Sequence, residues 1–258
     1  MPGLGLSIPE VAARRTIDPA ARALIARMGT PPDGARTAEI DRLVRALRGA
    51  GVWPRLIALY LLAAHDAQAA RLNWVEASYD LAAFNAPAFT VDRGYAGDGA
   101  TSYLDTGFAP TGWASPDSAC FGIWSLTADG STGPGIGAFD GDRQVALWNR
   151  YGGGFDLLFV RLNSDEANQV SVASTDGTGL FMGNRSSASD VQAYRNGASV
   201  ASSSSSSSNA PGVNNVLIGV PPNAGRFAAA VIADSLTAGE HAALHEALAA
   251  YLAATGAA

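Results

Sequence analysis

The sequence predicts a mainly β protein, an antiparallel sandwich or barrel that follows a short helical region and ends in one helix. Short alternating segments separated by Gly, Asp, Asn, Ser and Pro recur from about Leu72 onward, at a spacing of roughly 8–12 residues. Helical periodicity is found instead in the first 75 residues and near the C-terminal end. The chain has 258 residues, of which 48% are hydrophobic and 16% charged, so it can bury one large core.

Two amphipathic helices are expected in the N-terminal region, residues 1–75. Asp18-Pro19 supplies an N-cap and a first-turn proline for a helix that continues to Met28. The second helix covers about residues 35–49. Its apolar positions recur at i, i+3, i+4 and i+7, and they are Ile40, Leu43, Val44 and Leu47.

A third helix is predicted to begin at Trp53-Pro54 and to run through Leu62. Because this segment is apolar almost all round, a helix there needs cover on several sides. We therefore expect residues 1–75 to serve as an attachment or oligomerisation region. The predicted assembly interface consists of Trp53, Leu56, Leu59 and Leu62.

Residues 76–258 form the predicted sandwich. The strand candidates, taken in order, lie near 101–107, 119–126, 135–139, 144–149, 155–162, 168–174, 178–183, 190–195, 198–203, 214–219 and 226–233. The single cysteine, Cys120, lies within one of these segments, so a buried free thiol is expected and an internal disulfide is excluded.

The strongest local signal is Asn196-Gly197 between two alternating segments. Both residues tolerate the positive φ of a type I′ turn, so the pair predicts a two-residue β-hairpin loop. The turn sets the register: Tyr194 should face Ser199, and Ala193 should face Val200. Farther along, Thr237 and Glu240 have the spacing of a capping box and predict the start of the closing helix, on which His241 and His245 are expected to be surface residues.

Two parts of the chain resemble known proteins. Residues 190–240 combine the Asn-Gly hairpin, a strand ending in Ile218-Gly219, a strand over 226–233 and the Leu-Thr…Glu helix start. This order resembles the C-terminal half of laminin-G-like, concanavalin A-like jelly-roll domains. Residues 86–108 and the helical lead-in over 40–74 are similar to the jelly-roll structural proteins of bacteriophage and prophage virions, as in phages of alphaproteobacteria. The resemblance spans residues 17–255 and implies a jelly-roll sandwich in a virion component.

The sequence offers little catalytic chemistry. Enzymes with a concanavalin-like fold usually carry E-x-D-x-x-E or E-x-D-x-E on one strand, and neither pattern is present. The acidic residues Asp98, Asp140, Asp142, Asp165 and Glu166 lie in turn-like segments, where turn chemistry accounts for them. No cofactor is expected, and calcium held by one of these loops is the alternative left open.

Three aromatic residues are candidates for ligand binding. Trp113 lies in a Pro-Thr-Gly loop, and Trp148 and Tyr151 end a strand before three glycines. Such rings can stack on a sugar, or they can cap the core of the sandwich. The sequence is compatible with either role.

Charge and hydropathy exclude several other classes of protein. Residues 1–75 hold ten arginines and six acidic residues, far from the basic stripe of a nucleic-acid-binding protein. The sequence shows neither a leader nor an apolar run of the length that spans a membrane. We expect no nucleic-acid partner and no membrane insertion.

The resemblance and the absence of catalytic motifs lead to one functional expectation. The chain is predicted to be a non-enzymatic phage virion protein, assembled in the host cytoplasm: a tail fibre, a receptor-binding subunit or a capsid-decorating component. Its expected partners are other virion proteins, further copies of itself and a polysaccharide of the host surface. A soluble carbohydrate-binding lectin is the alternative, followed by a glycan-degrading enzyme.

Overall fold

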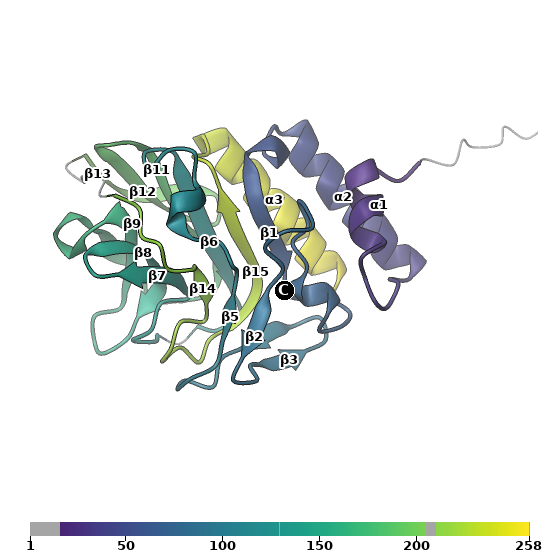
Figure 1. Cartoon of the computed structure of the whole chain (residues 1–258), viewed down its shortest axis with the longest axis horizontal. Coiled ribbons are helices and arrows are strands. Elements are labelled where there is room, and N and C mark those ends of the chain that lie inside the picture. The colour runs from purple at the N-terminus through teal and green to yellow at the C-terminus, as the bar shows by residue number, and fades with distance from the viewer. Residues whose placement is uncertain (1–15, 129, 205–209, 258) are drawn as a thin grey trace, which may run out of the picture.

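The computed structural model describes residues 16–128, 130–204 and 210–257. Three α-helices are present: α1 (Pro19–Ile25), α2 (Gly34–Gly49) and α3 (Ala238–Ala254). Two antiparallel sheets form a sandwich, with the helices gathered at one end and one side of it (Figure 1). The predicted fold class is therefore confirmed.

The first sheet, sheet A, has eight strands. In spatial order they are β13 (Ala198–Ser203), β12 (Asp190–Arg195), β11 (Gly179–Ser187), β6 (Ala119–Ser125), β15 (Arg226–Ala233), β4 (Gly94–Ala96) and β3 (Ala88–Thr90), with β1 (Leu56–Leu61) also paired to β15. The second sheet, sheet B, has seven. They are β10 (Val170–Ala173), β9 (Leu157–Ser164), β8 (Arg143–Tyr151), β7 (Ile136–Asp140), β14 (Leu217–Ile218), β5 (Tyr103–Asp105) and β2 (Ala82–Phe84).

The core lies between the two sheets and continues under the helices. Phe121, Ile123 and Phe181 of sheet A and Leu147 and Val160 of sheet B are completely buried. Helix α3 covers the outer side of sheet A, and α2 packs on α3. The free thiol of Cys120 is buried as expected, and burial raises its pKa far above the usual range.

The predicted caps at Asp18 and Thr237 are confirmed, and the structure adds a third polar cap, Asp33, at the start of α2. Asp18 and Asp33 accept hydrogen bonds from the first turns of α1 and α2. Thr237 and Glu240 form the capping box of α3 in both directions. Helix α1 ends at Ile25, three residues before the predicted end.

The third predicted helix is wrong. Residues Trp53–Arg55 form one 3-10 turn, and Leu56–Leu61 is strand β1, which pairs with β15. A segment that is apolar on every side suits a strand covered on both faces as well as it suits a buried helix, and periodicity cannot separate the two over six residues. The position of β1 also means that the region 1–75 contributes a strand to the sandwich.

The predicted assembly interface loses its basis for the same reason. Trp53 is 9% exposed and Leu56 6%, while Leu59 and Leu62 are completely buried. All four side chains belong to the same continuous core as the two sheets. Of the two possible sources of cover, the sandwich or another subunit, the sandwich of the same chain buries these side chains.

The Asn196-Gly197 hairpin is confirmed with one correction of register. Asn196 has φ 49° and Gly197 φ 79°, as a type I′ turn requires. Tyr194 faces Ser199 as predicted, but a bulge follows and Ala193 faces Ala201. The extra residue, Val200, is 39% exposed and does not join the apolar face of the hairpin.

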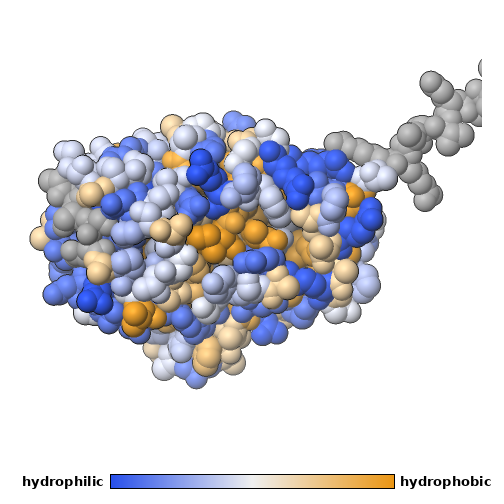
Figure 2. Space-filling view, turned by 45° about the horizontal axis from the view of Figure 1, so that its top comes forward, coloured by the Kyte–Doolittle hydropathy of each residue, from blue (hydrophilic) through white to orange (hydrophobic). Residues whose placement is uncertain are grey.

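All eleven predicted strands are present, with ends shifted by a few residues. The four strands that the alternation missed are β1, β2, β3 and β4, and three of these have only three residues. Large apolar side chains exposed at the surface are few, and in Figure 2 hydrophobic residues gather near the middle of one face with polar residues around them. No helix among the described residues has the length and apolar character to cross a membrane.

Candidate functional site

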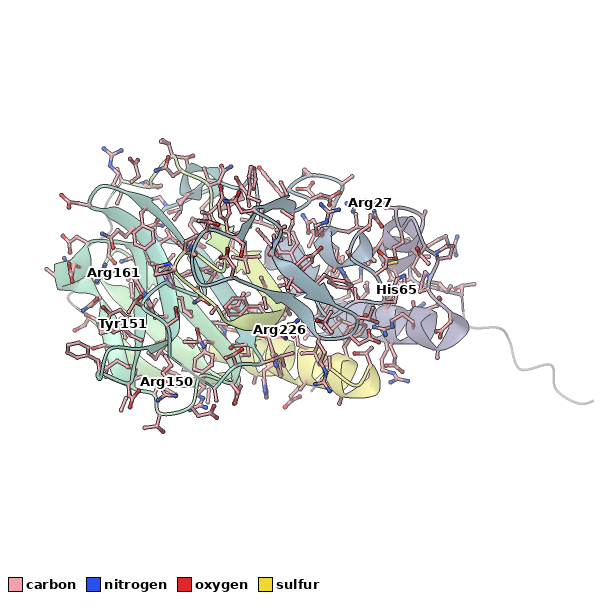
Figure 3. The ribbon with its side chains drawn as sticks, turned by 90° about the horizontal axis from the view of Figure 1, so that it is seen from below. Arg27, His65, Arg150, Tyr151, Arg161 and Arg226 are labelled. Atoms are coloured by element: carbon pink, nitrogen blue, oxygen red, sulfur yellow. The ribbon has the colours of Figure 1, made fainter. Side chains whose placement is uncertain are left out.

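A pocket of about 390 Å³ opens on the outer side of sheet B, over β8 and β9. Its lining is mainly aromatic: Thr132, Trp148, Tyr151, Phe155, Phe159, Arg161, Glu166 and Gln169. Figure 3 labels Tyr151 and Arg161 at one end of the molecule and Arg27 and His65, from the helical region, toward the other. We call this the aromatic pocket.

The register of β8 and β9 places the aromatic rings on one face. Trp148 pairs with Phe159, and Ala146 pairs with Arg161, while the intervening pair Leu147 and Val160 points into the core. Successive residues of a strand alternate between faces, so these outward positions form one cross-strand patch. The Trp148 and Phe159 rings meet edge to face, with centroids 6.2 Å apart.

The turn between β8 and β9 presents an additional ring. Gly153 and Gly154 have φ values of 77° and 91°, which only glycine adopts readily, so the turn depends on these residues. The Arg150 guanidinium binds the Asp156 carboxylate at 2.8 Å and fixes the end of the turn. Phe155, between these anchors, is 63% exposed and lies 5.9 Å from the Tyr151 ring.

The charged group of the pocket is Arg161, and its charge is balanced within the site. Its guanidinium lies over the Trp148 ring, with Cζ 5.2 Å from the centroid. It donates to Gln169 Oε1 at 3.0 Å and to Gln144 Oε1 at 2.5 Å. An ion pair with Glu166 at 3.2 Å completes the arrangement, and the Glu166 side chain is 78% exposed.

Two of the three predicted ligand-binding residues meet in this pocket. Tyr151 is half-buried and available at the rim. Trp148 is only 7% exposed, and its indole N–H donates to the carbonyl oxygen of Thr132 at 2.9 Å. Trp148 therefore forms the base on which other rings and Arg161 rest, while Tyr151 and Phe155 carry the accessible surface.

Trp113 lies elsewhere, and its prediction as a ligand-binding residue is not supported by its position. The ring is 4% exposed and packs edge to face on Phe108 at 5.2 Å. Its N–H donates to Ala233 O at 2.7 Å. Of the two roles considered for Trp113, the structure shows the second: the ring caps the core of the sandwich.

Phe155 and Phe159 line the aromatic pocket, but the sequence analysis did not predict them as site residues. The signal was present in the sequence. Phe159 occupies an alternate position in the strand that follows the three glycines, and a hairpin through those glycines brings it opposite Trp148.

Two of the loops considered for calcium, those of Asp98 and Asp165, show turn chemistry. Asp98 Oδ1 accepts hydrogen bonds from the N–H groups of Ser102, Ala100 and Thr101, and these bonds hold the pKa of Asp98 well below its usual range. Asp165 caps a 3-10 turn over Glu166–Asn168. No group of three His, Cys, Asp or Glu side chains suited to a metal occurs within the described residues.

His241 of α3 is not a surface residue, and His245 is only partly exposed, which corrects the sequence-based expectation. His241 is completely buried and stacks on Tyr194 with centroids 3.7 Å apart. His245 stacks on Trp124 at 5.5 Å and is partly buried. The face of α3 that carries them is turned toward sheet A, and helical spacing alone could not show which face docks.

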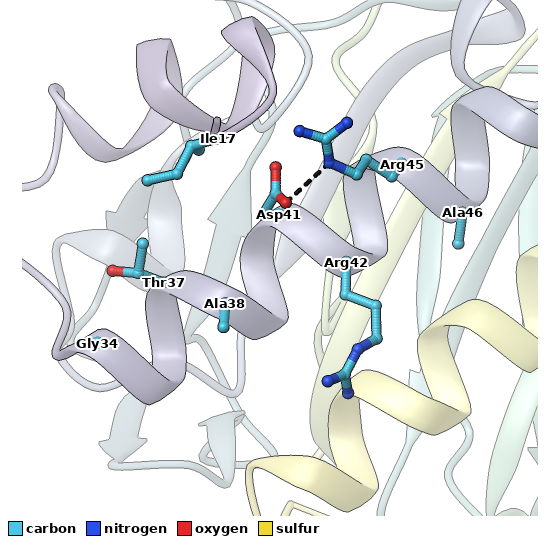
Figure 4. A pocket seen from close by; sticks show the side chains of 8 residues that line it. All are labelled: Ile17, Gly34, Thr37, Ala38, Asp41, Arg42, Arg45 and Ala46. Carbon is cyan, nitrogen blue, oxygen red and sulfur yellow. Dashed lines mark hydrogen bonds and ion pairs between the residues drawn. The ribbon is translucent and has the colours of Figure 1, made fainter. Parts of the chain in front are cut away.

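A larger pocket, of about 570 Å³, lies over α2 and beside Ile17 (Figure 4). Its charged groups are paired with one another or with neighbours. Asp41 binds Arg45 at 2.8 Å, and Arg42 binds Glu39 at 2.7 Å. No aromatic residue lines it, so it offers less than the aromatic pocket for binding a sugar ring.

No family model and no curated protein matches the sequence. Solved structures do share the fold. Domain 4 of AbnA, a GH43 extracellular arabinanase from Geobacillus stearothermophilus solved in complex with arabinotriose, aligns with a TM-score of 0.51 and 16% identity, over 74% of this chain and 98% of that domain. The sialidase of Trypanosoma rangeli aligns with a TM-score of 0.57 and 12% identity, over 83% of this chain and 40% of the sialidase.

These likenesses define the class of fold. The chain is an antiparallel β-sandwich of the kind found as a domain in glycan-acting proteins, and it spans less than half of the sialidase. At 12–16% identity the comparison shows the fold alone. The function must therefore be argued from the aromatic pocket.

Proposed function

We propose that the protein binds a carbohydrate in the aromatic pocket without cleaving it. The observation that carries the proposal is the pair of the exposed Phe155 and the half-buried Tyr151, which lie beside a glycine turn and next to the buried Trp148. Aromatic rings present an apolar face on which a sugar ring stacks, and neighbouring polar groups select its hydroxyls. Glu166 and Gln169 supply such groups at the same rim. The arabinotriose-bound domain with a similar fold supports this assignment.

We propose binding rather than hydrolysis because of the carboxylates. Cleavage of a glycosidic bond generally needs two carboxyl groups, one on each side of the bond. Among the described residues that line the aromatic pocket, Glu166 is the single carboxylate, and it is engaged with Arg161. A glycan-degrading enzyme is thus the weaker candidate.

The biological setting that we propose is the surface of a phage particle, on the basis of the sequence resemblance. The aromatic pocket and the helical region lie toward opposite ends of the molecule (Figure 3), an arrangement that suits attachment at one end and binding at the other. Stacking on a few rings gives weak affinity per site, which many copies on one particle would raise. A soluble lectin would use the same pocket, and immunolabelling of purified particles distinguishes the two settings.

The test of binding is a glycan array that includes neutral and acidic glycans and arabinotriose, probed with the full chain. We expect retention of a subset of glycans and their recovery without shortening. Phe155→Ala should reduce binding at least about tenfold, equivalent to 1.4 kcal/mol, with little change in stability, because that side chain is 63% exposed.

Phe84→Ala is the matched control. Phe84 is also an exposed ring of sheet B, at 42%, but it lies outside the aromatic pocket. Equal effects of the two variants would contradict the assignment of the pocket. Release of shorter oligosaccharides would show an enzyme instead.

A further inference from the structure

A second pocket lies on the same outer face of sheet B, over β7, β14 and β5. Its volume is about 460 Å³, and its polar lining includes Asp105, Asn214 and Asn215. Phe139 forms one wall of this second pocket, is 37% exposed, and meets the Trp148 ring edge to face at 6.1 Å. The two pockets therefore adjoin across the contact between Phe139 and Trp148.

The strand register shows that the two pockets belong to one continuous row. Asp105 pairs with Leu217, Leu217 with Gly137, Gly137 with Ala146, and Ala146 with Arg161. This row crosses five adjacent strands on one face, from the second pocket to the aromatic pocket. Neighbouring strands are about 4.8 Å apart, so the row spans roughly 19 Å. A disaccharide is too short to cover that distance, whereas a tetrasaccharide covers it.

The charges along this row favour a neutral ligand. At one end Arg161 is paired with Glu166 and held by two glutamine side chains, so it presents little unbalanced positive charge. At the other end Asp105 accepts hydrogen bonds from the Gly107 N–H and the Asn215 amide, and it takes part in no ion pair among the described residues. A glycan with carboxylate groups would meet this uncompensated negative charge.

We propose that the carbohydrate ligand is a linear neutral oligosaccharide of about four units, which lies across sheet B from the aromatic pocket, over Phe139, to Asp105 and Asn215. This inference rests on the proposed function and adds the ligand class and a second subsite. Phe139 acts as the stacking ring between the subsites, and the carboxylate and amides of the second pocket receive the hydroxyls of the distal units. Phe139 is thereby a determinant of ligand length.

The test uses calorimetric titration of the full chain with arabino-, xylo-, cello- and malto-oligosaccharides of two to six units. For the series that binds, affinity should rise at least about tenfold between the disaccharide and the tetrasaccharide, and then level off. Phe139→Ala should remove most of this gain and leave disaccharide affinity within about twofold. Phe84→Ala, a ring of similar exposure outside both pockets, should keep the full gain.

Three results would overturn the inference. Affinity that does not change with length, or a gain that survives in Phe139→Ala, would confine the ligand to the aromatic pocket while the proposed function stands. Binding of acidic glycans only, on the array described above, would refute the neutral class. Absence of binding to every neutral and acidic glycan would refute the proposed function together with the inference.

Discussion

The buried imidazole of His241 is expected to make the protein less stable as the solution becomes acidic. The side chain has no exposed surface, and neither ring nitrogen has a hydrogen-bond partner in the described part of the chain. Burial lowers the pKa of His241 to about 4, with the Glu240 carboxylate acting in the opposite direction. Because a charged ring stacked on Tyr194 would lose its hydration without gaining a partner, the folded state holds the neutral form.

The sign of the effect follows from the two pKa values. The folded-state pKa lies below the unfolded value of 6.5, so the stabilisation is complete above pH 6.5 and is lost as the pH falls toward about 4. The full loss is about 3 kcal/mol, of which about 2 kcal/mol is expected by pH 5. Burial also lowers the pKa of His245, opposed by Glu246, and this adds a loss of the same sign.

The assay is urea unfolding, followed by tryptophan fluorescence, at about pH 7.5 and about pH 5. The wild-type free energy of unfolding should decrease by about 2 kcal/mol or more between these conditions. His241→Phe keeps a stacked ring and removes the titrating group, so most of the decrease should disappear. His245→Phe is the control and should retain the His241 part. An equal pH dependence of wild type and His241→Phe would refute the reasoning.

Two further predictions concern the framework. Gly197→Val places a β-branched residue at φ 79°, and its Cβ would lie 3.0 Å from Ala242 Cα, so thermal or urea unfolding should show a loss of about 1–3 kcal/mol. Gly141→Val, at φ 59° with open space around the added Cβ, should cost less, and a neutral Gly197→Val would contradict the described turn. A chain that begins near residue 80 lacks β1 and should unfold without cooperativity, whereas one that begins at Thr16 keeps every described element and should unfold cooperatively. A cooperative transition in the shorter chain would show that β1 is dispensable.

The elements that depend on local chemistry could be predicted from the amino-acid pattern alone. The Asn196-Gly197 turn needs two residues that tolerate positive φ, and the capping box needs Thr237 and Glu240 three positions apart. Alternation was also sufficient for strands such as β9 and β12, along which buried and partly exposed positions alternate. These signals act over a few residues, so the surrounding fold does not alter them.

Which surfaces face one another depends on packing between segments that are distant in the sequence. The apolar run after Trp53 became strand β1 because β15 offers it backbone partners, and a local pattern carries no information about a partner more than 150 residues away. For Trp113 and Trp148 the sequence allowed either a stacking ring or a ring that caps the core, and packing leaves them only 4% and 7% exposed. The aromatic pocket arises where Trp148, Phe155 and Arg161 meet through strand pairing, because register and packing, rather than sequence proximity, set which side chains share a surface.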